Sequence, residues 1–119
     1  MTAIHIKFPS LTLKAGPRAL AHIRANGLNA AEVGTLPGAA GGPKALGIQG
    51  LDLALFGEWL PAAPRERSLI GASVGSWRFA SACLPDAAEG IRRLGQLYTE
   101  QNFAKGVTMA QISLSSQRM

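Results

Sequence analysis

The sequence has 119 residues, 47% of them apolar and 16% charged, which suits a single domain and excludes an intrinsically disordered chain. Twelve Lys and Arg against seven Asp and Glu leave a net charge of +5, which favours acidic partners. The basic residues are scattered and aromatic residues make up only 6% of the chain, so nucleic acid is not an expected partner, whereas peripheral contact with an anionic membrane stays open. A lone Cys83, the lack of a secretory signal and the lack of a long apolar run predict a cytoplasmic protein without a disulfide or a transmembrane segment.

The first part of the chain predicts an arm, a helix and a strand. Residues 1–16 are expected to form an N-terminal arm, in which Pro9 confines the apolar alternation to an edge strand. A Pro start signal and an Asn-Gly stop signal bound a helix over residues 17–25. Residues 32–36 predict a short buried strand, and the loop that follows, residues 38–44, is rich in Gly and Ala.

The second part predicts a strand between helices. Apolar residues at helical spacing predict a long helix over 48–59, and residues 68–70 predict a second buried strand. Further helices are expected over 74–84 and from Asp86 toward Gly106, with one more strand within 107–114. Because a strand, a helix and a strand follow one another, the two strands are expected to be parallel and joined by a right-handed crossover.

One motif among these predicted elements contains a candidate catalytic residue. Residues 71–75 read Gly-Ala-Ser-Val-Gly, which matches G-x-S-x-G, with an apolar strand before it and a helix after it. A Ser at a sharp turn from strand to helix has a strained backbone, and small flanking residues let a substrate approach its hydroxyl. The pattern therefore predicts Ser73 as a nucleophile, with a plain Gly-rich turn as the alternative.

The earlier Gly-rich loop can supply the hydrogen-bond donors that such a nucleophile needs. Backbone N–H groups of Gly41 and Gly42 are expected at the carboxyl end of the first strand, beside the serine turn, where they would stabilise an oxyanion. A nucleotide-binding loop is disfavoured because Lys44 follows Pro43 and precedes Ala45, which breaks G-x-x-x-x-G-K-[ST]. A purely structural turn remains the other interpretation.

Taken together, the two loops resemble those of the patatin-like phospholipase family, over residues 32–84. That family combines a Gly-rich oxyanion loop after its first core strand with G-x-S-x-G further along the chain. Its loop usually reads as three glycines, any residue, Arg or Lys, then Gly. Here residues 40–45 read Ala-Gly-Gly-Pro-Lys-Ala, which keeps two glycines and the basic residue.

The resemblance implies an α/β fold with a parallel-sheet, three-layer core of the patatin-like type, incomplete in this single domain of residues 1–119. It implies Ser73 as the nucleophile and the oxyanion hole at Gly41 and Gly42. It also implies three supporting positions: Lys44, Gly71 and Gly75. The implied activity is that of a serine lipid acyl hydrolase, a phospholipase or esterase that cleaves a lipid or other ester.

The family's proton acceptor is an Asp in a downstream D-G-[GA] motif, which this sequence lacks. Its only Asp residues are Asp52, interpreted as a solvated helix position, and Asp86, interpreted as a helix N-cap. His5 and His22 precede Ser73, contrary to the order of the α/β-hydrolases, and are interpreted as surface or packing residues. The sequence thus predicts the N-terminal part of a longer enzyme, poorly active alone. The alternative is a non-catalytic, truncated or degenerate module that binds a partner or a membrane surface.

The remaining candidates are interpreted as structural. His5, His22 and Cys83 lack the spacing of metal ligands, so neither a metal nor a cofactor is expected, and Cys83 is predicted to be a buried small apolar residue. Either Trp77 or Phe79 is expected to pack under the sheet, while Arg78 faces solvent or an acidic partner. The paired Arg92 and Arg93 are assigned to a solvated helix face.

Overall fold

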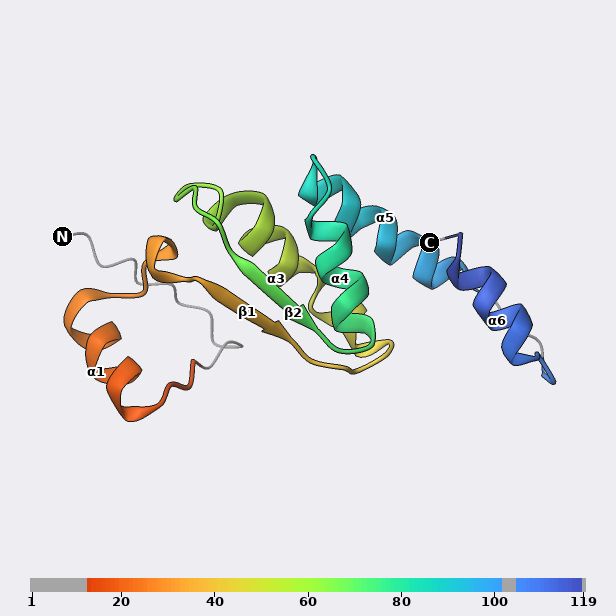
Figure 1. Ribbon diagram of the computed structural model, residues 1–119, viewed down its shortest axis with the longest axis horizontal. Helices are drawn as coiled ribbons and strands as arrows, with labels where there is room; N and C mark the ends of the chain where they lie inside the picture. Colours follow the sequence, from red (N-terminus) through yellow and green to blue (C-terminus); the bar gives the residue numbers. More distant parts are fainter. Residues whose placement is uncertain (1–12, 102–104, 119) are drawn as a thin grey trace.

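The computed structural model describes residues 13–101 and 105–118 and shows an elongated molecule (Figure 1). Its extents are 55 × 27 × 23 Å. Its radius of gyration is 16.9 Å, against about 13.5 Å expected for a compact domain of this length. Helices α1 (Pro17–Asn26) and α6 (Met109–Ser116) lie at opposite ends, and the sheet and the other helices lie between them.

Helix α1 confirms the helix predicted over residues 17–25. It begins at Pro17 and ends at Asn26; the amide of the following Gly27 donates to the carbonyl of Ile23, and the φ of 79° at Gly27 turns the chain out of the helix. The predicted strand over 32–36 begins later than expected. The Asn29 side chain caps a 3₁₀ turn, η1 (Ala30–Glu32), by accepting a hydrogen bond from the amide of Ala31, and this turn occupies the start of the predicted strand.

Two short parallel strands form the sheet. Strand β1 (Thr35–Gly38) pairs with β2 (Ser68–Gly71), which confirms the second predicted strand and the parallel pairing. The prediction that both strands are buried is wrong, because alternate residues of each strand are exposed on a face that no described element covers. Helix α4 (Val74–Ala82), predicted over 74–84, packs against both strands. One face of the sheet turns toward α4, while the opposite face is exposed, with Ile70 63% accessible. The described residues thus form a mixed α/β fold, mostly helical, with a two-stranded sheet rather than a complete three-layer core.

The predicted long helix over 48–59 is present as a helix α3 (Gln49–Ala54) that continues directly into a π-helical turn η2 (Leu55–Trp59). A separate short helix α2 (Lys44–Gly47) precedes it. The break between α2 and α3 falls at Ile48, whose φ of −106° and ψ of 7° leave the helical region. Glycines on both sides of Ile48 weaken the helix there, since glycine has low helix propensity.

Helix α5 (Ala87–Glu100) packs against α4 and supplies most of the core on the side of α4 that faces away from the sheet. The Asp86 side chain accepts a hydrogen bond from the amide of Glu89 at 2.9 Å, which confirms the predicted N-cap. Its apolar stripe buries Ile91 and Leu94. The helix ends at Glu100, earlier than the predicted Gly106, because Gln101 already has an extended backbone.

The strand predicted within 107–114 is wrong, since α6 occupies this segment. Thr108 accepts a hydrogen bond from the amide of Gln111, and the Gln111 side chain accepts one from the amide of Thr108. This reciprocal capping box fixes a helix start and overrides the apolar alternation. Most of the predicted N-terminal arm lies outside the described residues. None of the described helices has both the length and the apolar character needed to cross a bilayer.

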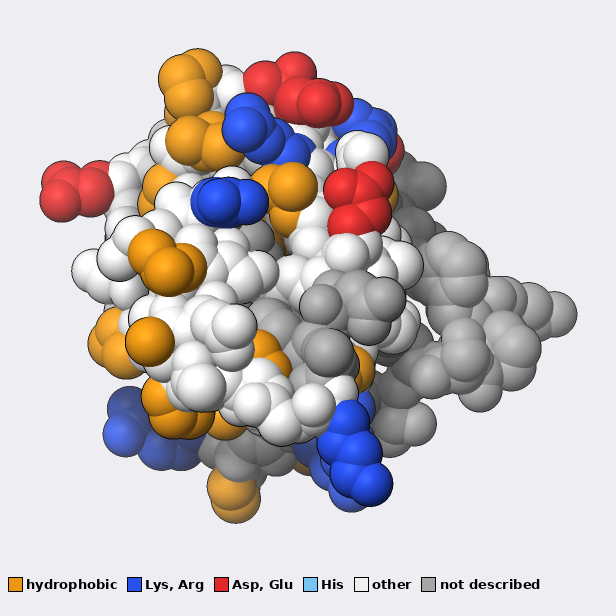
Figure 2. Space-filling view, turned by 90° about the vertical axis from the view of Figure 1, so that its right-hand side faces the viewer, with side chains coloured by type: hydrophobic (Ala, Val, Ile, Leu, Met, Phe, Trp, Pro, Cys, Tyr) orange, Lys and Arg blue, Asp and Glu red, His pale blue; other side chains and the backbone are white. Residues whose placement is uncertain are grey.

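Charged side chains are spread over the end of the molecule that Figure 2 shows. Basic side chains stand at several separate places on this face, and acidic side chains lie near those at its top. Arg92 and Arg93 are both exposed on α5, which confirms their assignment to a solvated helix face. This face therefore carries both signs of charge.

Candidate active site

The turn from β2 into α4 has the backbone of a strained elbow. Ser73 has a φ of 53° and a ψ of −124°, and it is the only non-glycine residue with a positive φ in the described part of the chain. A non-glycine residue with such backbone angles costs about 1–3 kcal/mol of folding free energy and persists only where the surrounding structure holds it in place. Ser73 is exposed, so its hydroxyl projects from the bend toward solvent rather than into the core.

Glycines on both sides of Ser73 hold this bend against the sheet. A side chain on Gly71 would overlap the backbone amide of Ser76, and one on Gly75 would overlap the carbonyl oxygen of Gly38. The hydroxyl of Ser76 closes the turn by donating to the carbonyl of Gly71 at 2.8 Å. The spacing G-x-S-x-G is thus explained by sterics, because only glycine lets α4 approach the end of β1 so closely.

The Gly-rich loop begins at the same place. Gly38 pairs with Gly71 in the sheet register, and the amide of Ala72 donates to the carbonyl of Gly38 at 2.9 Å. Figure 1 shows the loop after β1 and the elbow after β2 at the same end of the two strands. The structure therefore brings together the start of the predicted oxyanion loop and the predicted nucleophile elbow.

The loop presents unused hydrogen-bond donors. Gly42 has a φ of 53°, a left-handed conformation that glycine adopts without strain. The carbonyls of Gly41 and Gly42 accept from the amides of Lys44 and Ala45, which start α2. The amides of Gly41 and Gly42 donate to no other described residue. Lys44 itself is exposed at the first position of α2.

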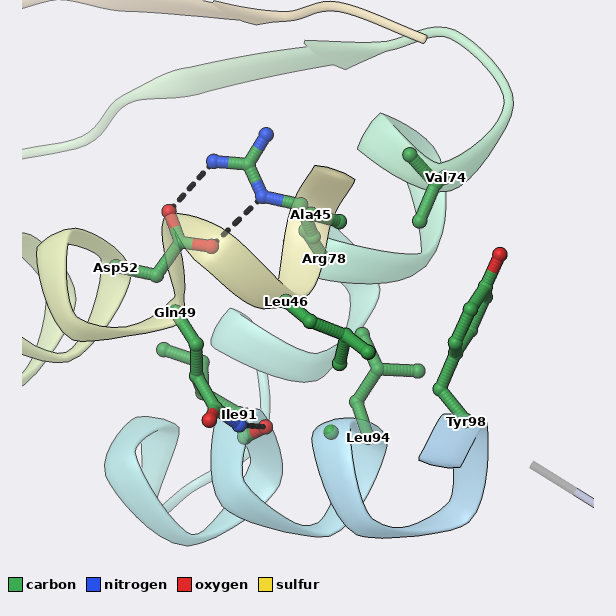
Figure 3. Close-up of a pocket in the computed structure, with 10 residues that line it drawn as sticks. Ala45, Leu46, Gln49, Asp52, Val74, Arg78, Ile91, Leu94 and Tyr98 are labelled. Atoms are coloured by element: carbon green, nitrogen blue, oxygen red, sulfur yellow. Dashed lines mark hydrogen bonds and ion pairs between the residues drawn. The ribbon is translucent and has the colours of Figure 1, made fainter. Parts of the chain in front are cut away.

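A buried ion pair lies behind the elbow, and it corrects the interpretation of Asp52. This residue is 3% exposed rather than solvated. The Arg78 guanidinium donates to both carboxylate oxygens of Asp52, with Nε–Oδ2 at 2.7 Å and Nη2–Oδ1 at 2.6 Å (Figure 3). These hydrogen bonds raise the pKa of Arg78, against the opposing effect of burial. Both Asp52 oxygens accept hydrogen bonds from Arg78, and no hydrogen bond joins Asp52 to Ser73 in the described part of the chain.

The other side chains singled out in the sequence lie away from the elbow's chemistry. Phe79 is the aromatic residue that packs under the sheet, whereas Trp77 is 40% exposed. Cys83 is exposed, so the prediction that it is buried is wrong: it follows the last turn of α4 and faces solvent. His22 binds Glu32 at the surface. No cluster of three His, Cys, Asp or Glu side chains suited to a metal occurs within residues 13–101 and 105–118.

A small pocket opens between α2, α3, α4 and α5, and Val74, the residue after Ser73, lines it (Figure 3). Its volume is about 20 Å³, and apolar side chains form much of its wall: Leu46, Val74, Ile91 and Leu94. The Asp52–Arg78 pair lines it as well, and Tyr98 stands on the side near Val74. Sequence reasoning missed Tyr98, because a single Tyr on an amphipathic helix carries no distinguishing signal.

Comparison of the chain with protein-family models, with curated proteins and with solved structures found no match. A function for this site therefore has to follow from its residues and their geometry.

Proposed function

We propose that the chain is a module of a serine acyl hydrolase of the patatin-like type, which cleaves a carboxylic ester of a lipid through Ser73. The observation that carries the proposal is the backbone of Ser73, a non-glycine residue at a φ of 53° between two sterically required glycines. Strain of this kind clusters at functional sites, where it aims a side chain. The amides of Gly41 and Gly42, which have no described acceptor in a loop that starts beside the elbow at Gly38, support the proposal.

The proposed reaction has two stages. Ser73 Oγ bonds to the ester carbonyl carbon, its proton passes to a carboxylate base, and the carbonyl electron pair moves onto oxygen beside the amides of Gly41 and Gly42. The ester C–O bond then breaks, and the leaving alkoxide takes up that proton as an alcohol. Water attacks the acyl-serine in the same way, which releases the carboxylic acid and restores the Ser73 hydroxyl.

The proton acceptor is the part of this mechanism that the described residues do not supply. No hydrogen bond joins Ser73 Oγ to a carboxylate or an imidazole in the described part of the chain, and Asp86 is engaged as an N-cap. We therefore propose a carboxylate from outside the described residues as the base. Without it, the elbow and the oxyanion loop retain only the binding and electrostatic contributions to catalysis.

Covalent labelling tests this proposal. A fluorescent alkyl fluorophosphonate is expected to label the full chain slowly, as Ser73 Oγ bonds to phosphorus and fluoride leaves. Ser73→Ala should abolish labelling, whereas Ser81→Ala, which removes a hydroxyl that donates to the carbonyl of Trp77 within α4, should leave it unchanged. Added sodium acetate should accelerate labelling in proportion to its concentration, because it replaces the absent carboxylate. Lack of labelling, or labelling that survives Ser73→Ala, would overturn the proposal.

The alternative function, a non-catalytic module that binds a partner, is favoured by the uncovered face of the sheet. Ile70 is 63% exposed there, and Pro37 is exposed on the neighbouring strand. A buried sheet face is the usual arrangement in parallel α/β folds, so exposed apolar residues at this position fit an interaction surface. The same labelling experiment decides between the two functions, since this alternative predicts no reaction at Ser73.

A further inference from the structure

The hydroxyl of Tyr98 lies beside the candidate oxyanion loop, although Tyr98 belongs to α5 and is distant in sequence. A Cβ atom built on Gly42 would lie 3.9 Å from the Tyr98 hydroxyl oxygen. The tip of the phenol therefore approaches the backbone of the loop at its left-handed residue. The Tyr98 side chain as a whole is half-buried, so packing against neighbouring residues restrains it.

The Tyr98 side chain also shares a pocket with the helix that follows the elbow. Tyr98 and Val74 line one pocket, and Val74 is the residue that follows Ser73. Figure 3 shows the phenol standing upright from α5, with its hydroxyl end directed toward the start of α4 where Val74 lies. The phenol thus approaches the loop at Gly42 and lines the same pocket as the residue after Ser73.

The Tyr98 hydroxyl is also available to a ligand. It forms no hydrogen bond with another residue in the described part of the chain, and no buried side-chain polar atom there lacks a partner, so the hydroxyl reaches solvent. A half-buried phenol generally has its O–H directed at a partner. Here the hydroxyl has no described protein partner, so it is free to donate to a bound ligand.

We propose that Tyr98 is a third hydrogen-bond donor to the oxyanion, in addition to the amides of Gly41 and Gly42. This inference rests on the proposed function. A phenol O–H donates to a negatively charged oxygen more strongly than to a neutral carbonyl, so it stabilises the tetrahedral intermediate more than the bound ester. The side chain touches the reacting oxygen and moves no proton to or from Ser73.

Tyr98→Phe is the direct test, because it removes only the hydroxyl oxygen. The rate constant for fluorophosphonate labelling is expected to fall about 10²-fold, the usual effect of losing one oxyanion donor. Thermal unfolding should be unchanged, since the hydroxyl has no described protein partner. Thr99→Val is the matched control: it removes a hydroxyl from the next residue, one that donates to the Gly95 carbonyl at 2.7 Å, and should leave the labelling rate constant unchanged.

The outcomes separate this inference from the proposed function. If wild type labels at Ser73 and Tyr98→Phe labels equally fast, the Tyr98 inference is wrong and the proposed function stands. If the wild-type protein is not labelled, both the Tyr98 inference and the proposed function are wrong. A second measurement needs no variant, because Tyr98 is the only tyrosine. Phosphonylation of Ser73 should slow nitration of Tyr98 by tetranitromethane, and an unchanged nitration rate would contradict the contact.

Discussion

Replacing Asp52 with alanine is expected to lower the free energy of unfolding by about 3 kcal/mol, because it leaves a buried guanidinium without its counter-ion. Arg78 is only 14% exposed, and both of its hydrogen bonds to Asp52 are shorter than those of neutral pairs. The two residues come from α3 and α4, so the pair fixes α3 against the helix that follows the elbow.

Urea unfolding followed by circular dichroism measures this effect. Glu32→Ala is the matched control, since it breaks the exposed His22–Glu32 pair and should cost no more than about 1 kcal/mol. The double variant Asp52→Leu with Arg78→Met should recover most of the loss, because it replaces the ion pair with apolar side chains of similar size. Equal destabilisation by Asp52→Ala and Glu32→Ala would contradict the role assigned to the buried pair.

Gly75→Ala is the second substitution with a large expected effect. The added methyl group would overlap the carbonyl oxygen of Gly38, a backbone atom that cannot move without disturbing the strand pairing. We expect the free energy of unfolding to fall by about 3 kcal/mol, at the upper end of the range for overpacking. We also expect fluorophosphonate labelling to be lost, because α4 and the elbow are pushed away from the loop after β1.

A second glycine in a helix provides the control for this change. A Cβ atom on Gly50, in α3, would meet nothing within 4 Å. Gly50→Ala should therefore raise the free energy of unfolding, by up to about 1 kcal/mol, through better helix propensity. Urea unfolding of both variants checks the prediction. If Gly75→Ala is as stable as Gly50→Ala, the elbow does not pack against β1 as described.

Local signals predicted much of the fold. The Pro start and Asn-Gly stop of α1, the N-cap at Asp86 and the strand before the serine motif each depend on a few neighbouring residues. The strand prediction for residues 107–114 was wrong because two local signals compete there, and the capping box at Thr108 prevails over the alternation of apolar residues. The exposed face of the sheet could not be predicted from strand patterns this short.

The parts of the site that depend on distant residues could not be predicted. Asp52 binds an arginine 26 positions along the chain, so helical spacing alone assigned it to solvent. Tyr98 reaches Gly42 only because α5 packs against α3 and α4. The serine motif, by contrast, was predicted from its own residues: the positive φ at Ser73 lies within residues 71–75, and the glycine at Gly75 marks the place where α4 approaches Gly38 of β1.

We propose that the Ser73 hydroxyl lies close enough to the amides of Gly41 and Gly42 for one oxygen atom to accept hydrogen bonds from both. A crystal structure of the chain after reaction with an alkyl fluorophosphonate would show whether this arrangement exists. We predict a phosphonyl group on Ser73 Oγ whose doubly bonded oxygen accepts hydrogen bonds from those amides. A phosphonyl oxygen that points to solvent, or a phosphonyl group on another residue, would contradict it.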